Sequence, residues 1–298
     1  MAENTPITPG TDYAEQPREV YPNAQLQLVA VELRYPFAPR LGSEEALSFF
    51  VSRVKDLPVA EPIQEQTFVF RNEGVPDIKG SFAFRLTTRD RATAATISPT
   101  KLALETTNYE RYGMFRRLLK HLLEALDDYG RPAGVERLGL RYIDEIKVPD
   151  VTAPSPDAWK PYIDHALVTP AEVVDEVLPN MRPRSWNGVL HLQSSNGTTL
   201  VVRYGALDGH AVNPDGPLRL TRRTEPGPFF LLDIDSFWHA EEVIADFDLS
   251  EVLATCDQLH RPISAVFERC ITDRLRDEVL RKERIGAERG GQPPDRQR

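Results

Sequence analysis

Residues 135–148, VERLGLRYIDEIKV, alternate in the way that predicts a single β-strand with one face toward a core. The LRY at 140–142 repeats the LRY at 33–35, which lies in an earlier predicted strand over 25–35. Each of the two strands is followed later in the chain by a strand that carries acidic residues and then by a long amphipathic helix. We infer an internal duplication, in which the chain builds the same kind of unit twice.

The first unit is expected over residues 23–134. After the strand at 25–35, Ser43 is a predicted N-cap for a helix that runs to Leu57, because its hydroxyl precedes two glutamates. Pro58 and Pro62 are expected to bracket a loop. Three strand-like segments follow, and the unit ends in a helix that has a leucine-rich stripe. The three segments and the helix are predicted at 65–71, 79–89, 92–109 and 111–129. The third segment can instead break at Ser98-Pro99, which would leave 101–109 as its regular part, since proline cannot donate to a ladder.

The second unit is expected over residues 135–283, with a proline-rich insert at 150–185. Asn196-Gly197 predicts a tight turn between two strands of a hairpin, since this dipeptide tolerates positive φ. A further strand and a helix that begins at Asp248 complete the unit, and Pro262 is expected to kink or split that helix. The hairpin strands, the last strand and the helix are predicted at 186–194, 198–206, 229–237 and 249–283.

The fold class that follows is α+β. We expect two similar β-α-β-β-β-α halves, with antiparallel sheets and long amphipathic helices packed on one face. The halves can form either a pseudo-symmetric pair or one continuous sheet. Residues 1–22 are predicted to be a flexible leader and residues 284–298 a disordered tail, because both are polar and lack periodicity.

Composition narrows the class of protein. The chain has 298 residues, of which 41% are apolar and 27% charged, and its formal net charge is −9. No run approaches the roughly 18 apolar residues that a bilayer span needs, and no secretory signal is visible, so a cytoplasmic protein is expected and a membrane partner is not. The negative charge makes nucleic acid an unlikely partner. Cys256 and Cys270 fall in one helical pattern and are predicted to be reduced and buried.

Three stretches carry a resemblance. They are AQLQLVAVELRYPF near the start, RLGLRYIDEIKVP in the middle, and FFLLDIDSFW followed by LHRPISAVFERCITDRLRDEV near the end. Together they span residues 24–279, and the chain resembles a sporadically distributed family of uncharacterised bacterial proteins of about this length. The resemblance implies an α+β protein that is scattered among bacteria in the manner of defence, toxin–antitoxin or immunity genes. It implies no catalytic residues.

Opposite charges recur at equivalent places in the two predicted units. Arg34 and Arg141 are expected on the polar faces of the opening strands, whereas Glu105, Asp233 and Asp235 are expected on the polar faces of the closing strands. The simplest interpretation is a pair of cross-strand ion pairs, Arg34 with Glu105 and Arg141 with Asp233. Such pairs would be part of the scaffold.

A second interpretation of the same residues is chemical. Asp233 and Asp235 project the same way from one strand, so they could bind a divalent metal together with Glu105, Asp144 or Glu145 as a third ligand. The motif is weak, since D-x-D occurs widely and no glycine-rich phosphate loop accompanies it. The six histidines show no metal-binding spacing, and no G-x-S-x-G is present.

Two functions from different classes therefore remain open. The first is a non-enzymatic, cytosolic protein-interaction module, such as a subunit, antitoxin or immunity factor of a bacterial defence or toxin–antitoxin system, with another protein as partner and no cofactor. Its polar sheet faces or proline-rich insert would contact the partner. The alternative is a metal- or nucleotide-dependent phosphoryl-transfer or nuclease-type enzyme that uses the Asp233/Asp235 strand, with Arg141 or Arg203 on a phosphate. Self-association is compatible with either.

Overall fold

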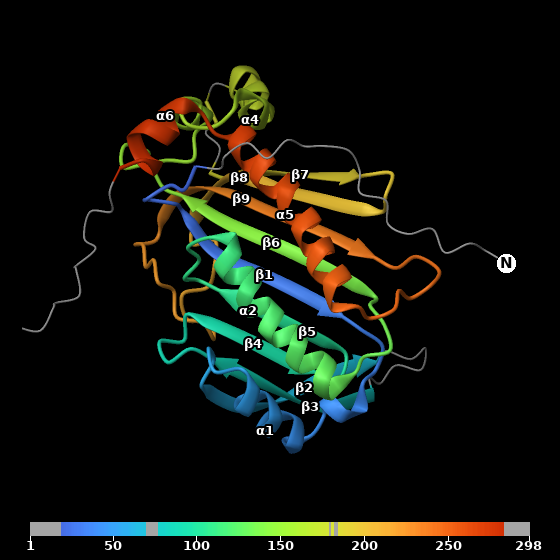
Figure 1. The fold of residues 1–298 in the computed structure, drawn as a ribbon. Helices are drawn as coiled ribbons and strands as arrows, with labels where there is room; N and C mark the ends of the chain where they lie inside the picture. The colour runs from blue at the N-terminus through green and yellow to red at the C-terminus, as the bar shows by residue number, and fades with distance from the viewer. Residues whose placement is uncertain (1–18, 70–76, 179, 182–183, 283–298) are drawn as a thin grey trace, which may run out of the picture.

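The computed structural model describes residues 19–69, 77–178, 180–181 and 184–282. Over these residues nine strands form one antiparallel sheet in the order β2-β3-β4-β5-β1-β6-β9-β8-β7 (Figure 1). The predicted α+β class with antiparallel pairing is confirmed, and the two predicted halves share one continuous sheet. The predicted leader over 1–22 and tail over 284–298 lie largely or wholly outside the described residues.

The two LRY strands are neighbours at the centre of this sheet. β1 (Leu26–Arg34) pairs antiparallel with β6 (Arg137–Ile146), and Ala30 lies opposite Arg141. On their outer sides, β5 (Lys101–Thr106) pairs with β1, and β9 (Gly227–His239) pairs with β6. In each half of the chain the last strand therefore pairs with the first, and earlier strands lie further out.

On the side of β5, two expectations need correction. The segment predicted over 92–109 breaks at Ser98-Pro99, the alternative that the proline suggested, and both parts are strands: Pro99 and Thr100 form the turn of a hairpin between β4 (Thr93–Ser98) and β5. The first half thus has four strands after its helix, where three were predicted. β3 (Asp77–Thr87) follows, and then the edge strand β2 (Val59–Val69).

The loop predicted between Pro58 and Pro62 is wrong, since β2 runs through Pro62. A proline has no N–H to donate to a ladder, and it is tolerated in a strand whose outer edge has no neighbour. β2 has β3 as its neighbour on one side only. The loop was predicted because a proline cannot donate to a ladder. At the edge of the sheet this missing donor has no strand to pair with, so Pro62 fits within β2.

The hairpin predicted in the second half is confirmed. β7 (Trp186–Gln193) and β8 (Thr198–Gly209) pair antiparallel, and Gly197 takes a φ of 79° in the turn between them. β8 also pairs with β9 along its whole length, from Thr198 opposite Trp238 to Gly209 opposite Gly227. β7 is left as the second edge of the sheet.

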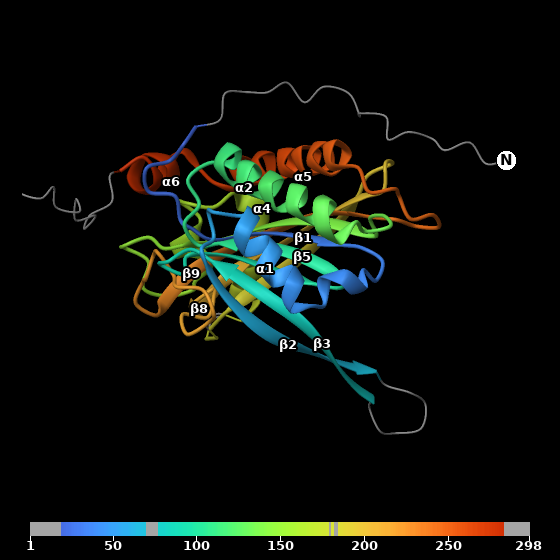
Figure 2. The same ribbon diagram turned by 60° about the horizontal axis from the view of Figure 1, so that its bottom comes forward.

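The helices lie over one face of the sheet (Figure 2). α1 (Glu44–Arg53) begins at Ser43, whose hydroxyl accepts from the Ala46 N–H as predicted, and α2 (Tyr112–Ala125) packs beside α5 (Leu249–Cys270). Between the helices and the sheet lies a core of buried aliphatic and aromatic side chains. Its members include Val29, Val31, Leu33, Phe50, Phe84, Leu102, Leu119, Leu122, Leu140, Ile234, Leu253 and Leu259.

The final helix ends earlier than predicted. α5 stops at Cys270, and the short helices α6 (Asp273–Leu275) and η3 (Arg276–Leu280) follow. Ile271 forms a bridge with Ile163, and the Thr272 hydroxyl accepts from the Leu275 N–H, so a new helix starts there. Pro262 lies inside α5 and does not split it.

The proline-rich insert contains α3 (Pro156–Trp159) and α4 (His165–Val177) and builds a second core around the buried Trp159. Trp159 and Phe230 of β9 are 5.5 Å apart between ring centroids. Contacts from this insert to Ile271 and Thr272 explain why α5 stops where it does: the chain turns to meet the insert. Sequence periodicity carries no information about such a partner.

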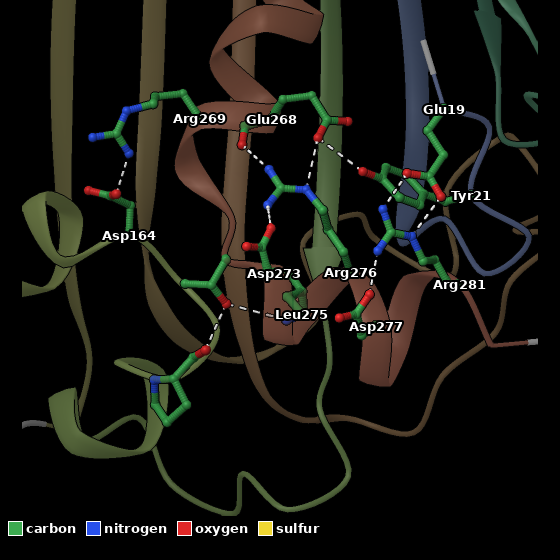
Figure 3. A network of polar contacts seen from close by, with 12 residues as sticks. Glu19, Tyr21, Asp164, Glu268, Arg269, Asp273, Leu275, Arg276, Asp277 and Arg281 are labelled. Atoms are coloured by element: carbon green, nitrogen blue, oxygen red, sulfur yellow. Dashed lines mark hydrogen bonds and ion pairs between the residues drawn. The ribbon is translucent and has the colours of Figure 1, made fainter. Parts of the chain in front are cut away.

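Distant parts of the chain meet at the end of α5 (Figure 3). Arg281 binds Glu19 through two contacts of 2.7 Å, and the Asn23 N–H donates to the Leu280 carbonyl at 3.0 Å. The Tyr21 hydroxyl donates to Glu268, which also accepts from Arg276 at 3.1 Å. We call this set of contacts the terminal clamp, because it fastens the segment before β1 to the segment after α5.

Two further expectations concern single features. Cys256 and Cys270 are free and buried, as predicted. Burial raises the pKa of each thiol to about 11, so both are protonated at neutral pH. No helix among the described residues combines the length and apolar character needed to cross a lipid bilayer.

Candidate interaction face

The sheet has a face without helices, which we call the open face. Directly paired residues on neighbouring antiparallel strands point to the same side, so the register assigns side chains to this face. Ala30 of β1 is opposite both Glu105 and Arg141, and Arg141 is opposite Asp235. Alternation along the strands adds Arg34 and Asp233 to the same face. All five residues singled out in the sequence thus lie on the open face.

Arg141 and Asp233 form the ion pair that the sequence predicts. Arg141 Nε lies 2.7 Å from Asp233 Oδ1, and Nη2 lies 2.7 Å from Oδ2, which is the two-pronged geometry that suits a guanidinium and a carboxylate. Arg203 of β8 adds a contact of 3.4 Å to Oδ2. Asp233 itself is 3% exposed. Its two oxygens are therefore both taken by arginines.

A second chain of charges crosses β9, β6 and β1. Arg137 Nη2 lies 3.8 Å from Asp235, and Arg137 Nη1 lies 3.4 Å from Glu32. Glu32 also accepts from Arg34 Nε at 2.7 Å. Arg203 was predicted only as a phosphate contact of the alternative enzyme, and Arg137 and Glu32 were not among the predicted site residues. Their positions along the strands could have identified them. Arg137 and Glu32 are an even number of residues from Arg141 and Arg34 on the same strands, and Arg203 pairs with Asp233.

The predicted pair of Arg34 with Glu105 is wrong. Glu105 is opposite Ala30, and Arg34 is opposite Lys101, so the two residues are four positions apart along the ladder, or about 13 Å at the usual rise. Arg34 instead binds Glu32 on its own strand. Burial raises the pKa of the Glu105 carboxyl, opposed by the nearby charge of Arg85. The sequence predicted which face of the sheet these residues lie on, but it did not predict which residues are paired between the strands.

The arrangement does not match the metal interpretation. Asp233 is engaged by Arg141 and Arg203, and Asp144 is adjacent to Ile143 on the other side of β6, toward the helices. Glu145, though buried, accepts from the Thr224 hydroxyl at 2.7 Å and pairs with Lys147 at 3.2 Å. Within the described part of the chain, no three His, Cys, Asp or Glu side chains group as metal ligands.

The two signs of charge lie at different depths on the open face. The Arg34 side chain is 56% exposed and that of Arg141 45%, whereas the Asp233 side chain is 4% exposed. Burial raises the pKa of Asp235, and the nearby arginines oppose this rise. Asp233 and Asp235, whose side chains are 4% and 18% exposed, therefore lie deeper than Arg34, Arg141 and Arg203, whereas Glu32 is slightly more exposed than Arg137.

A polar cluster on the helix side was not anticipated from the sequence. The hydroxyls of Tyr109 and Tyr142 are 2.9 Å apart, and Tyr112 stacks on His260 with 3.8 Å between ring centroids. Burial raises the pKa of Tyr112 and of Tyr142 far above the usual value, so both phenols stay neutral. Neutral, mutually bonded rings of this kind hold α2 and α5 to β6. They offer no activated base.

A surface hollow of about 310 Å³ lies where the end of α1 meets α2. Arg53, Lys55, Asp56, His121 and Glu124 line it. Binding sites for small molecules are mostly apolar with a few polar groups, and this lining is entirely charged or titratable. The hollow therefore contributes nothing to the functional argument.

Comparisons with known proteins add no identification. A scan against protein-family models finds no match to this chain, and a search of curated proteins finds no similar sequence.

Proposed function

We propose that this protein is a non-enzymatic protein-interaction module whose open face binds an acidic segment of a partner protein. The observation that carries the proposal is a difference in depth between the two signs of charge on four adjacent strands. The guanidinium groups of Arg34, Arg141 and Arg203, on β1, β6 and β8, are more exposed than the carboxylates of Asp233 and Asp235 on β9.

Buried acids prepare the arginines for a ligand. Because Asp233 fixes Arg141 through Nε and Nη2, the side chain has already lost much of its rotational freedom before any partner binds. A guanidinium has five N–H donors, so the contacts to Asp233 do not exhaust its capacity. A second carboxylate, from a partner, would meet donors that are already oriented.

An acidic protein segment fits this face better than a nucleic acid does. The net charge of −9 opposes a long polyanion, which would extend well beyond the arginine layer. Stacking of bases needs accessible aromatic rings, and the ring of Phe237 on this face is covered by Arg137, whose Cζ lies 4.6 Å from the ring centroid. A short acidic peptide requires only the arginines.

The biological setting is part of the same proposal. A subunit, antitoxin or immunity factor of a bacterial defence or toxin–antitoxin system acts by holding another protein, and an arginine-lined sheet face suits that task. The family resemblance drawn from residues 24–279 supports this setting.

We propose further that the two halves arose by duplication. The strand order supports this: β5 pairs with β1 as β9 pairs with β6, and the preceding strands follow outward in reverse order in both halves. The opening strands β1 and β6 then lie antiparallel about the centre of the sheet. A duplicated unit that pairs through its first strand would give this arrangement.

The binding proposal is tested with a fluorescein-labelled octaglutamate peptide and fluorescence anisotropy. A double variant, Arg34→Gln with Arg203→Gln, removes two exposed cations and leaves Arg141 on Asp233. We expect it to weaken peptide binding at least fivefold, and we expect binding by the unaltered protein to fall as salt rises.

Arg117→Gln provides the matched control, because Arg117 is an exposed arginine on α2, over the opposite face. It should bind the peptide as the unaltered protein does. Equal losses of peptide affinity in the double variant and in Arg117→Gln would show that binding depends only on the net charge of the protein. Tighter binding of ATP or of an oligothymidylate than of the peptide would replace the protein partner with a phosphate ligand and overturn the proposal.

A further inference from the structure

The outer edge of the sheet at β7 lacks the protection that edge strands usually have. The eight residues Trp186–Gln193, WNGVLHLQ, contain no lysine, arginine, aspartate or glutamate and no proline. Val189, Leu190 and Leu192 are each about half exposed. A long, uncharged edge of this kind is a template for another strand, because no strand among the described residues pairs with its outer N–H and C=O groups.

The opposite edge strand of the same sheet, β2, has two features that protect an edge from pairing with another strand. β2 contains Glu61 and Pro62. A proline removes a donor, and a glutamate adds like charges if two copies of β2 come together. The contrast between the two edges is a property of this chain, and it singles out β7.

We propose that β7 of one copy pairs antiparallel with β7 of a second copy, which gives a dimer with one continuous sheet across both copies. Identical strands can meet here without repulsion between like charges, since β7 contains no lysine, arginine, aspartate or glutamate. A charged strand would place its charges against the apolar side chains of this edge, whereas a second β7 presents apolar side chains to it.

The symmetry of such a pair restricts the register. A two-fold axis normal to the sheet keeps the faces of both copies aligned, so residues that pair must have the same parity. Centred on Leu190, the pairing sets Leu190 opposite its own copy and Leu192 opposite Gly188. It avoids two histidines facing each other, which centring on His191 would produce.

Gly188 is suited to a large neighbour across the new ladder. The ring of Tyr204 fills the space where a Gly188 side chain would lie, with Tyr204 Cζ 2.5 Å from the position of a Cβ. Leu192 of the second copy would therefore pack against an aromatic ring, a favourable cross-strand contact. The dimer would also place two open faces side by side, which goes beyond what one copy offers a partner.

Sedimentation equilibrium of the full-length protein tests the proposal. We expect a dimer, at twice the chain mass of 33.7 kDa. Leu190→Lys and Leu190→Glu should each give a monomer, because the two-fold axis brings like charges together. An equimolar mixture of the two variants should recover the dimer, since lysine then faces glutamate. Circular dichroism melting confirms that each variant is folded.

Val243→Lys is the control, as Val243 is 76% exposed in the loop after β9 and away from β7 in the chain. It should dimerise as the unaltered protein does. A monomeric unaltered protein at every concentration would overturn the proposal. If the folded Leu190→Lys and Leu190→Glu variants stay monomeric when mixed, the pairing centred on Leu190 is overturned.

Discussion

Arg141 and Asp233 join an exposed cation to a buried carboxylate, and this asymmetry decides what each residue contributes to stability. Removing the arginine leaves Asp233 in a site that is 3% exposed, with only the longer contact to Arg203. Removing the partner of a buried charge costs about 3–5 kcal/mol, and the remaining arginine and the half-exposed side chain reduce that figure. The carboxylate, more than the guanidinium, sets the cost.

We therefore expect Arg141→Ala to lower the free energy of unfolding by about 1–3 kcal/mol. Arg34→Ala, which breaks an exposed pair with Glu32, should cost less than about 1 kcal/mol. Urea unfolding of the two variants measures the difference. Equal losses would mean that the Asp233 site is open to water.

Asp144 is a buried acid on the helix side of β6, between Tyr142 and Ile146 in the sequence, with 5% of its surface exposed. Burial raises the pKa of its carboxyl from the usual value near 3.8 to about 7. The folded protein then holds a proton that the unfolded chain releases. Stability from this group is full below about pH 4 and is lost as the pH rises through about 7.

The pH dependence gives a second prediction. Asp144→Asn cannot ionise, so the variant should lose less stability than the unaltered protein between pH 4 and pH 8, by up to a few kcal/mol. Urea midpoints at a series of pH values give this comparison. A profile for the Asp144→Asn variant that matches the unaltered one would contradict the burial argument.

Residues also show where sequence reasoning reaches its limit. Alternation assigned Arg34, Glu105, Arg141, Asp233 and Asp235 to a shared polar face, because parity along a strand is local. The predicted pairing of Arg34 with Glu105 is wrong because the register of β1 on β5, which local alternation does not determine, sets Arg34 opposite Lys101. Arg141 and Asp233 form an ion pair because β6 and β9 are adjacent. The repeat pattern suggested that the two strands are neighbours, but it could not establish it.

Among the elements, the β7–β8 hairpin depends on one glycine. A Cβ on Gly205 would lie 2.1 Å from the Trp186 carbonyl oxygen, which belongs to the backbone and cannot move aside without shifting β7. Gly205→Ala should therefore lower the free energy of unfolding by more than about 2 kcal/mol, in the range of strained core substitutions. Thermal unfolding followed by circular dichroism measures this loss.

Gly227 offers the matched comparison, because nothing lies within 4 Å of a Cβ built there. Gly227→Ala should be nearly neutral. A Gly205→Ala chain with unchanged stability would show that β7 moves freely on β8, and it would also weaken the case for β7 as a rigid edge.

Element boundaries followed the sequence where the signal was local and departed from it where the partner was distant. The caps at Ser43 and Asp248 and the Asn196-Gly197 turn are short-range chemistry and were predicted. β2 continued through Pro62 because of its place at the edge, and α5 stopped at Cys270 because the insert binds the next residues. The local sequence pattern predicts neither the edge position of β2 nor the end of α5.

For the whole molecule, the pairing of β1 with β6 unites the two halves in one sheet. The core cluster under α2 and α5 contains residues from both halves, such as Val31 and Ile234. We expect a single unfolding transition in urea, with the same midpoint by tryptophan fluorescence and by far-ultraviolet circular dichroism. The fluorescence reports the second half alone, since Trp159, Trp186 and Trp238 all lie there.

Two separated midpoints would indicate halves that fold independently, against the continuity of the sheet. The sequence predicted the class and the alternation of strands and helices, yet it left open whether the halves form one sheet or two. That choice depends on eight residue pairs between β1 and β6, each more than a hundred positions apart in the chain. Local patterns do not encode it.

The terminal clamp has a consequence for the order in which the molecule is made. Glu19 and Asn23 leave the ribosome early, but their partners Arg281 and Leu280 are among the last described residues to be synthesised. The segment ahead of β1 must therefore wait for nearly the whole chain before it can be fastened. A nascent protein whose synthesis stops after β9 would lack Leu280 and Arg281, so the segment ahead of β1 would have no clamp. Such a chain is a natural target for a chaperone.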